Sequence, residues 1–191
     1  VVMTNDAVPV VYNDIFLSAL TNVATLIPER KRADDNYYIV DFTLAEVQQL
    51  RFKPTFTDEN FSQHIATLEE SLTYFTLFTN LTGKTIQSVP VIKFPWFFRN
   101  EGIDISRVIL QKLISSTSSS EQSLFLKSYD PDELQRIKKD LLPGLPIEIH
   151  LIQGIEQNDG RETMRLTREK WTSYNYDWLF TRIGLRVLSG Y

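Results

Sequence analysis

Apolar and polar positions along the chain follow two spacings, one typical of strands and one typical of helices. Short β-rich runs predict strands at residues 1–4, 8–12, 88–93, 123–128 and 147–153. The turn residues Asn5 and Asp6 separate the first two runs, which therefore predict a strand, a turn and a second strand. Each later run is followed by a loop and a helical pattern, and this alternation is typical of a parallel sheet with crossover helices. We expect an α/β fold; periodicity alone leaves open a partial α/β barrel or an open sheet.

Apolar stripes at helical spacing predict four helices, which begin near residues 43, 68, 105 and 130. Thr43 starts a capping-box pattern ahead of the first helix, and Gly83 provides a stop for the second. Asp130 is an N-cap carboxylate followed by proline at the first helical position. The next acids, Asp132 and Glu133, are expected to interact with the positive end of the helix dipole.

The remaining segments are predicted to be loops, apart from one aromatic run at residues 94–98. Residues 22–36 are predicted to be polar and irregular, and their charge run at 29–32 is typical of a solvated loop. The serine-rich tract at 115–120 is predicted to be a flexible surface loop. The densest apolar run, residues 94–98, is far shorter than the roughly 18 apolar residues of a membrane span, so no transmembrane segment is expected.

Composition limits the chemistry further. The 191 residues are 42% hydrophobic with a net charge of −4, which fits a globular core and argues against binding to nucleic acid or an anionic membrane. The absence of cysteine excludes a disulfide scaffold, a thiolate zinc site and a cysteine nucleophile. Only His64 and His150 are available as histidine ligands. We expect residues 1–191 to form a single domain, and the ends at Val1 and Tyr191 are typical of a fragment or a processed chain.

Several segments, in the same order along the chain, resemble one family. These are residues 3–14, similar to T-x-D-x-x-x-V-x-x-H-D; residues 28–46; residues 67–70, similar to T-L-E-E; residues 90–97, similar to P-E-I-K-x-P-W-F; residues 129–138, similar to F-D-x-D-E-L-x-R-I-K; and residues 174–178, Y-N-Y-D-W. The chain resembles the glycerophosphodiester phosphodiesterases, in particular their periplasmic, bacterial-type branch. The agreement in order over nearly the whole chain is more specific than any single motif.

The resemblance implies a TIM barrel, of which this chain matches roughly the second to sixth strands. The family's H-R pair and its E-x-D metal pair would then lie ahead of Val1, and the last strands after Tyr191. The fold class we expect is thus an α/β, partial TIM barrel. Because open barrel edges need to be covered, we also expect the missing parts, a protein partner or self-assembly.

The same resemblance implies which positions carry the chemistry. Family members hold a divalent cation, often Ca²⁺, on carboxylates, while two histidines move protons. Asn13 stands at the position of the second histidine and Val91 at that of a ligand glutamate, whereas Asp14 and Lys93 are retained. Asparagine cannot exchange a proton near neutral pH, and valine has no lone pair for a metal. The resemblance therefore predicts a degenerate site, with no intact catalytic residue and no metal ligand in this chain.

The remaining candidates each have two interpretations. Lys93 is either a phosphate anchor or the partner of a buried carboxylate, and Asp14 either caps a turn or has a metal role. His150 either replaces the lost proton carrier or packs within its strand. Trp96, expected on a loop, either lines the mouth of the site, contacts lipid or belongs to a packed cluster.

Asn60 and Asn80 begin glycosylation sequons, which agrees with a secreted or periplasmic setting. Our preferred interpretation is a catalytically degenerate, secreted structural or interaction module that needs no cofactor. The alternative is an active enzyme that uses Ca²⁺ or Mg²⁺ to hydrolyse glycerophosphodiesters to glycerol 3-phosphate and an alcohol. A third interpretation keeps ligand binding without turnover, with Lys93 and Asp14 holding a phosphate-bearing head group.

Overall fold

A computed structural model describes residues 1–53, 64–84, 86–116, 124–155, 182 and 186. The chain divides into two compact units, Val1–Ile86 and Gln87–Tyr191, and each is described by itself. The prediction of a single domain over residues 1–191 stays a prediction.

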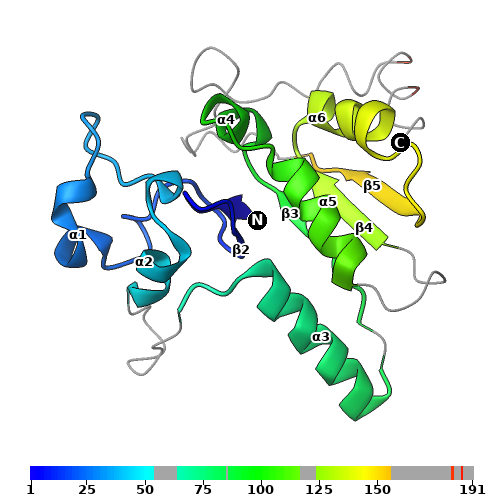
Figure 1. Ribbon diagram of the computed structural model, residues 1–191, viewed down its shortest axis with the longest axis horizontal. Helices are drawn as coiled ribbons and strands as arrows, with labels where there is room; N and C mark the ends of the chain where they lie inside the picture. Colours follow the sequence, from blue (N-terminus) through cyan, green and yellow to red (C-terminus); the bar gives the residue numbers. More distant parts are fainter. Residues whose placement is uncertain (54–63, 85, 117–123, 156–181, 183–185, 187–191) are drawn as a thin grey trace. The chain divides into compact units, whose positions relative to one another are not determined.

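The first unit begins with a hairpin and continues with short helices. Its elements are β1 (Val2–Met3), β2 (Pro9–Val10), α1 (Val23–Leu26), the 3₁₀ turns η1 (Pro28–Arg30) and η2 (Ile39–Asp41), α2 (Leu44–Gln49) and α3 (Leu68–Thr82) (Figure 1). The two strands pair antiparallel, with Val2 opposite Val10, as the turn residues between them predict. Val2, Met3 and Val10 are fully buried, so this hairpin contributes to the core of the unit.

Residues 22–36 are more ordered than the sequence predicts. They contain α1 and η1, and the fully buried side chain of Val23 anchors this segment in the core. Two arginines of the charge run form ion pairs within this unit. Arg30 pairs with Glu46 at 2.8 Å, and Arg32 pairs with Asp41 at 2.6 Å. The prediction of an irregular loop is therefore wrong for this segment, where a buried valine and intramolecular ion pairs stabilise short helical turns.

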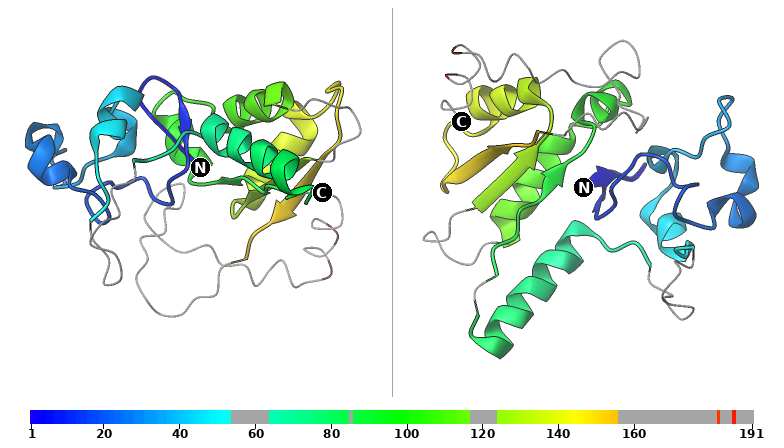
Figure 2. Two further views of the ribbon diagram at one scale, coloured as in Figure 1. Left: turned by 90° about the horizontal axis from the view of Figure 1, so that it is seen from below. Right: turned by 180° about the vertical axis from the view of Figure 1, so that it is seen from behind.

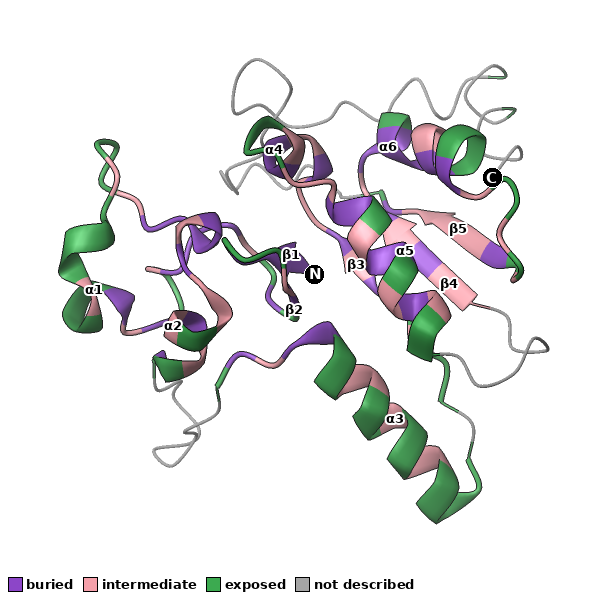
Figure 3. Cartoon of the chain, in the orientation of Figure 1, coloured by how far each residue is buried: buried purple, intermediate pink, exposed green. Residues whose placement is uncertain are grey.

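Helix α3 begins with a capping box and ends at the predicted glycine stop. The hydroxyl of Thr67 accepts from the backbone N–H of Glu70, whose carboxylate accepts from the N–H of Thr67 at 2.7 Å. At the other end Gly83 adopts the left-handed conformation, with φ of +67°, and donates its N–H to Thr79. Between these caps, Leu68 is the one buried residue of α3 (Figure 3).

The second unit is a parallel α/β layer. Its elements are β3 (Val91–Ile92), α4 (Pro95–Asn100), α5 (Ile105–Ser116), β4 (Leu124–Ser128), α6 (Pro131–Arg136) with the π-helical turn η3 (Ile137–Leu141), and β5 (Ile149–Gln153). The strands form a sheet in the order β3-β4-β5, and both pairs are parallel. The predicted alternation of strands and helices is confirmed here.

Helix α5 covers one face of this sheet. It lies in front of β3 and β4 in Figure 1 and behind the strands in the view from behind in Figure 2. Ile105, Ile109 and Leu113 of α5 are buried, as are Ile92 and Leu126 of the strands. Because successive side chains of a strand point to opposite faces, residues 91, 93 and 127 belong to the other face.

The aromatic segment after β3 forms helix α4, so the prediction that Trp96 lies on a loop is wrong. Phe94 has φ of +51° and ψ of +48°, which turns the chain, and Pro95 then occupies the first helical turn. Phe97 and Phe98 are buried, and Trp96 packs edge-on against Phe97 with ring centroids 6.2 Å apart. The packed-cluster interpretation of Trp96 is the one that the structure supports.

A buried carboxylate connects α4, α5 and α6. The Glu133 side chain is fully buried and accepts hydrogen bonds from Arg99 and from the Ser106 hydroxyl. It also pairs with Arg136 at 2.7 Å. Sequence reasoning assigned Glu133 only to the helix dipole, because its partners Arg99 and Ser106 are distant along the chain.

Candidate functional site

Asn13 and Asp14 follow β2 in the first unit. Asn13 is exposed. The Asp14 carboxylate accepts from the backbone N–H groups of Ile15 and Phe16 at 2.7 and 3.3 Å. This is the turn-capping geometry predicted for Asp14.

The tyrosine before Asn13 is not placed to exchange protons near neutral pH. Burial, and then the charge of Asp14, raise the pKa of Tyr12 well above its ordinary value of 10.0. Its hydroxyl donates to the carbonyl of Phe16 at 3.2 Å. Tyr12 therefore stays protonated near neutral pH and is held as a structural donor.

Val91 and Lys93 lie at the carboxyl edge of the sheet in the second unit. Val91 and Lys127 are paired across β3 and β4, and the same level of β5 is occupied by Ile152. Lys93, Tyr129 and Gly154 each lie two residues further along their chains. All six positions share the face opposite α5.

Two lysines converge on one aromatic ring at this edge. The ammonium nitrogens of Lys93 and Lys127 lie 4.7 and 4.9 Å from the centroid of the Tyr129 ring. Both lysines are half-buried, and neither forms an ion pair among the residues that the structure describes. Within this part of the chain, Lys93 has no carboxylate partner, which favours its interpretation as an anion contact. Lys127 was not identified as a site residue from the sequence. The signal that could have identified it was a charged residue within the predicted strand 123–128, two residues after Phe125.

Gly154 makes room for this arrangement. A Cβ atom built on Gly154 would lie 2.7 Å from two ring carbons of Tyr129 and 2.8 Å from Cε of Lys127. Such distances are shorter than real Cβ contacts, so any side chain at position 154 would displace the ring or the lysine. The end of β5 is thus shaped around Tyr129 and Lys127.

His150 is not brought to this edge. It pairs with Phe125 near the start of β4 and β5, four residues before Gly154, which corresponds to about 13 Å along a strand. Its ring lies 5.0 Å from that of Phe125, and its Nε2 lies 3.9 Å from Glu148. Trp96 likewise belongs to the α4 cluster.

The residues at this edge do not fit a divalent cation. Ca²⁺ and Mg²⁺ prefer oxygen ligands, but Val91 offers none and its neighbour Lys127 is itself a cation. In the described part of the chain, no three His, Cys, Asp or Glu side chains cluster closely enough to hold a metal. The expectation that no cofactor is needed stays a prediction.

Further predictions concern glycosylation, the motif at residues 174–178 and membrane-spanning segments. Asn80 is exposed on α3, so a glycan there would project into solvent. Asn60 and the motif at residues 174–178 lie outside the described residues. No helix in the described part of the chain is both long and apolar enough to span a membrane.

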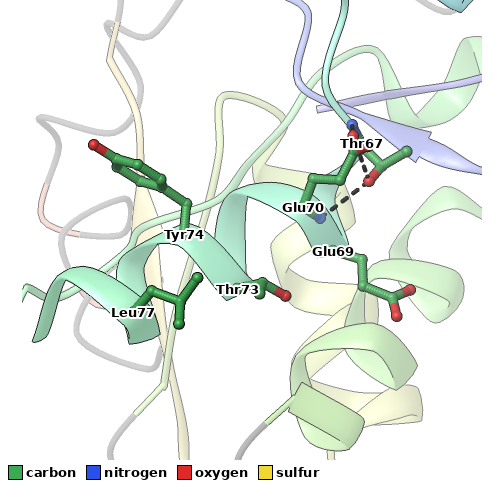
Figure 4. Close-up of a pocket in the computed structure, with 6 residues that line it drawn as sticks. All are labelled: Thr67, Glu69, Glu70, Thr73, Tyr74 and Leu77. Atoms are coloured by element: carbon green, nitrogen blue, oxygen red, sulfur yellow. Dashed lines mark hydrogen bonds between the residues drawn. The ribbon is translucent and has the colours of Figure 1, made fainter. Parts of the chain in front are cut away.

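Helix α3 carries an exposed apolar side. Tyr74, Leu77 and Leu81 are 65%, 54% and 86% exposed and are spaced by three and four residues. Figure 4 shows a pocket along this helix, lined by Thr67, Glu69, Glu70, Thr73, Tyr74 and Leu77.

The three parallel strands and their covering helices define the second unit as an α/β layer, and Lys93 and Lys127 lie at its carboxyl edge. The sequence profile of the Glycerophosphoryl diester phosphodiesterase family matches residues 1–186. The chain belongs to this family, as its motifs indicate.

Two curated relatives bear the name glycerophosphodiester phosphodiesterase. The protein from Haemophilus influenzae is 34% identical over 195 residues, a match that covers 93% of this chain and 54% of the relative. The protein from Treponema pallidum is also 34% identical, over 208 residues, covering 100% of this chain and 58% of the relative. The chain therefore spans somewhat more than half the length of these relatives.

A solved structure supports the fold. The crystal structure of a protein named as a glycerophosphoryl diester phosphodiesterase from Silicibacter pomeroyi DSS-3 matches with a TM-score of 0.56 and 18% identity. The match covers 87% of this chain and 57% of that one. The expected α/β, partial TIM-barrel fold is confirmed.

Proposed function

We propose that this chain is a catalytically degenerate member of its family, which acts as a secreted structural or interaction module. The observation that carries the proposal is Val91. It stands at the family's ligand-glutamate position, shares a sheet face with Lys93, and is paired with the cation Lys127. A divalent ion at this level would meet a methyl-bearing side chain and an ammonium group.

The histidine position supports the same interpretation. Asn13 presents an exposed amide, which cannot act as a general acid or base near neutral pH. Loss of such a group typically lowers a rate by about 10²–10⁴. The neighbouring Tyr12 offers no substitute because its pKa is raised.

The second candidate is an active phosphodiesterase that cleaves glycerophosphodiesters to glycerol 3-phosphate and an alcohol, with Ca²⁺ or Mg²⁺. The names of the relatives from Haemophilus influenzae and Treponema pallidum favour it. It would rely on groups other than Asn13 and Val91 for proton transfer and metal binding.

Hydrolysis of glycerophosphocholine separates the two candidates. We expect the full chain to release no glycerol 3-phosphate above background, with either Ca²⁺ or chelator present. The matched control is the double variant Asn13→His, Val91→Glu, which restores both family groups. Turnover by the unmodified chain that requires Ca²⁺ and stops with chelator would overturn the proposal.

The secreted setting and the interaction role rest on α3. Its exposed Asn80 is available for glycosylation, and its apolar residues Tyr74, Leu77 and Leu81 are available to a protein partner or a second copy. We expect the natural protein to lose mass when its N-linked glycans are removed enzymatically. An unchanged mass would contradict glycosylation at Asn80 and would remove this support for the secreted setting.

A further inference from the structure

Lys127 lies beside the position where the family resemblance places a metal-ligand glutamate. Val91 is its partner across β3 and β4, and the two positions share one face of the sheet. A carboxylate is therefore absent at this level, and a cation is present next to it. The valine in place of a carboxylate and the ammonium group of Lys127 both make this level of the sheet more positive.

We propose that Lys127 and Lys93 together bind a phosphate dianion without a metal ion, and that Lys127 sets a preference for phosphomonoesters over phosphodiesters. The inference rests on the proposed function, since it states what the degenerate site still binds. The ligand class is inorganic phosphate or a small alcohol phosphate.

Charge decides between the two ligand classes. Lys93 and Lys127 provide two positive charges near one ring, and no ion pair within the described residues neutralises either of them. A phosphomonoester carries a charge of about −1.5 to −2 at pH 7, because its second pKa is near 6. A phosphodiester carries a single negative charge. The lysine pair therefore matches the monoester.

The surroundings hold the two ammonium groups in place. The Tyr129 ring lies within cation–π distance of both, and Gly154 leaves the space that the ring and Lys127 occupy. The cluster lies at the carboxyl ends of three parallel strands, where sites in TIM-barrel folds are built. Phosphate at this edge would be reached by Lys93, which follows β3, and by Lys127 of β4.

Titration calorimetry of the full chain in chelating buffer tests the inference. Inorganic phosphate, glycerol 3-phosphate and glycerophosphocholine are compared as ligands. We expect tighter binding of the first two, with affinity rising between pH 5 and pH 7 as phosphate gains its second charge. Lys127→Gln is expected to weaken phosphate binding roughly tenfold and to reduce the preference for monoesters. Lys139→Gln makes the same charge change at an exposed site and should bind as the unmodified chain does.

Two variants that keep Lys127 provide independent readouts. Val91→Glu places a carboxylate across from Lys127 and should lower phosphate affinity by competing for its charge. Gly154→Ala should also weaken binding, because its Cβ displaces Tyr129 or Lys127. Thermal melts verify that each variant folds, and the affinity of Val91→Glu decides the matter if Lys127→Gln does not fold.

The inference is overturned if the unmodified chain gives no heat with phosphate, or if binding appears only with added Ca²⁺. Equal affinities for Lys127→Gln and Lys139→Gln would also overturn it. Turnover of glycerophosphocholine with Ca²⁺ would contradict the proposed loss of catalysis. The titrations in chelating buffer would still decide whether Lys127 binds phosphate, so the two proposals can fail independently.

Discussion

At the scale of single residues, two side chains on neighbouring strands define the character of the candidate site. Val91 provides no ligand atom where the family resemblance implies a metal ligand, and Lys127 places a positive charge directly across from it. Neither side chain belongs to the face of the sheet that carries the buried residues Ile92 and Leu126. The fold can therefore persist while the chemistry at the carboxyl edge changes.

The buried carboxylate of Glu133 is the residue whose loss should affect stability most directly. We expect Glu133→Gln to destabilise the second unit by about 3 kcal/mol, because Arg99 and Arg136 would lose their shared counter-charge. Urea denaturation measures this change. The matched control, Glu148→Gln, alters a side chain that is 78% exposed and should stay within about 0.5 kcal/mol of the unmodified chain. Equal midpoints for the two variants would contradict a structural role for Glu133.

Residue roles were predictable from the sequence where they depend on near neighbours. The Asx turn of Asp14 and the N-cap of Asp130 both follow from residues within three positions, and both are present. The pairing of Lys127 with Val91 and the contact of Glu133 with Arg99 depend on strand register and helix packing. A single sequence does not encode such contacts in any local pattern.

At the scale of elements, capping signals were the most reliable guide. Helices α2 and α3 begin at Thr43 and Thr67 with reciprocal capping boxes, and α3 ends at Gly83 as predicted. Helix α4 was missed because it is short, and because its start depends on the left-handed conformation of Phe94. Non-glycine residues rarely adopt that conformation, so the residue types around Phe94 offer no reason to expect it.

The contact between α6 and the start of α5 should make stability pH-dependent. Burial raises the pKa of Asp104, but hydrogen bonds from Arg136 and from the backbone of Arg107, together with the Arg136 charge, outweigh it and hold the pKa below its ordinary value of 3.8. The stabilisation is present above pH 3.8 and is lost as pH falls through the depressed pKa. We expect urea midpoints measured from pH 6 to pH 3 to fall less steeply for Asp104→Asn. Parallel profiles for the two proteins would contradict this role.

At the scale of the whole molecule, the family fold and the proposed function are separate matters. The parallel sheet, the match over residues 1–186 and the solved relative agree on the fold. The chain covers 54% and 58% of the two curated relatives, so their names describe proteins of greater length. The function of this chain therefore depends on its own residues at the sheet edge, where Val91, Lys93 and Lys127 lie.

The most direct test of catalytic degeneracy is a ³¹P NMR time course of glycerophosphocholine with the full chain and Ca²⁺. The spectrum reports the diester and any monoester product in one sample. We expect the diester signal to persist unchanged and no monoester resonance to appear. A monoester signal that grows with time and is abolished by chelator would contradict the proposed loss of catalysis.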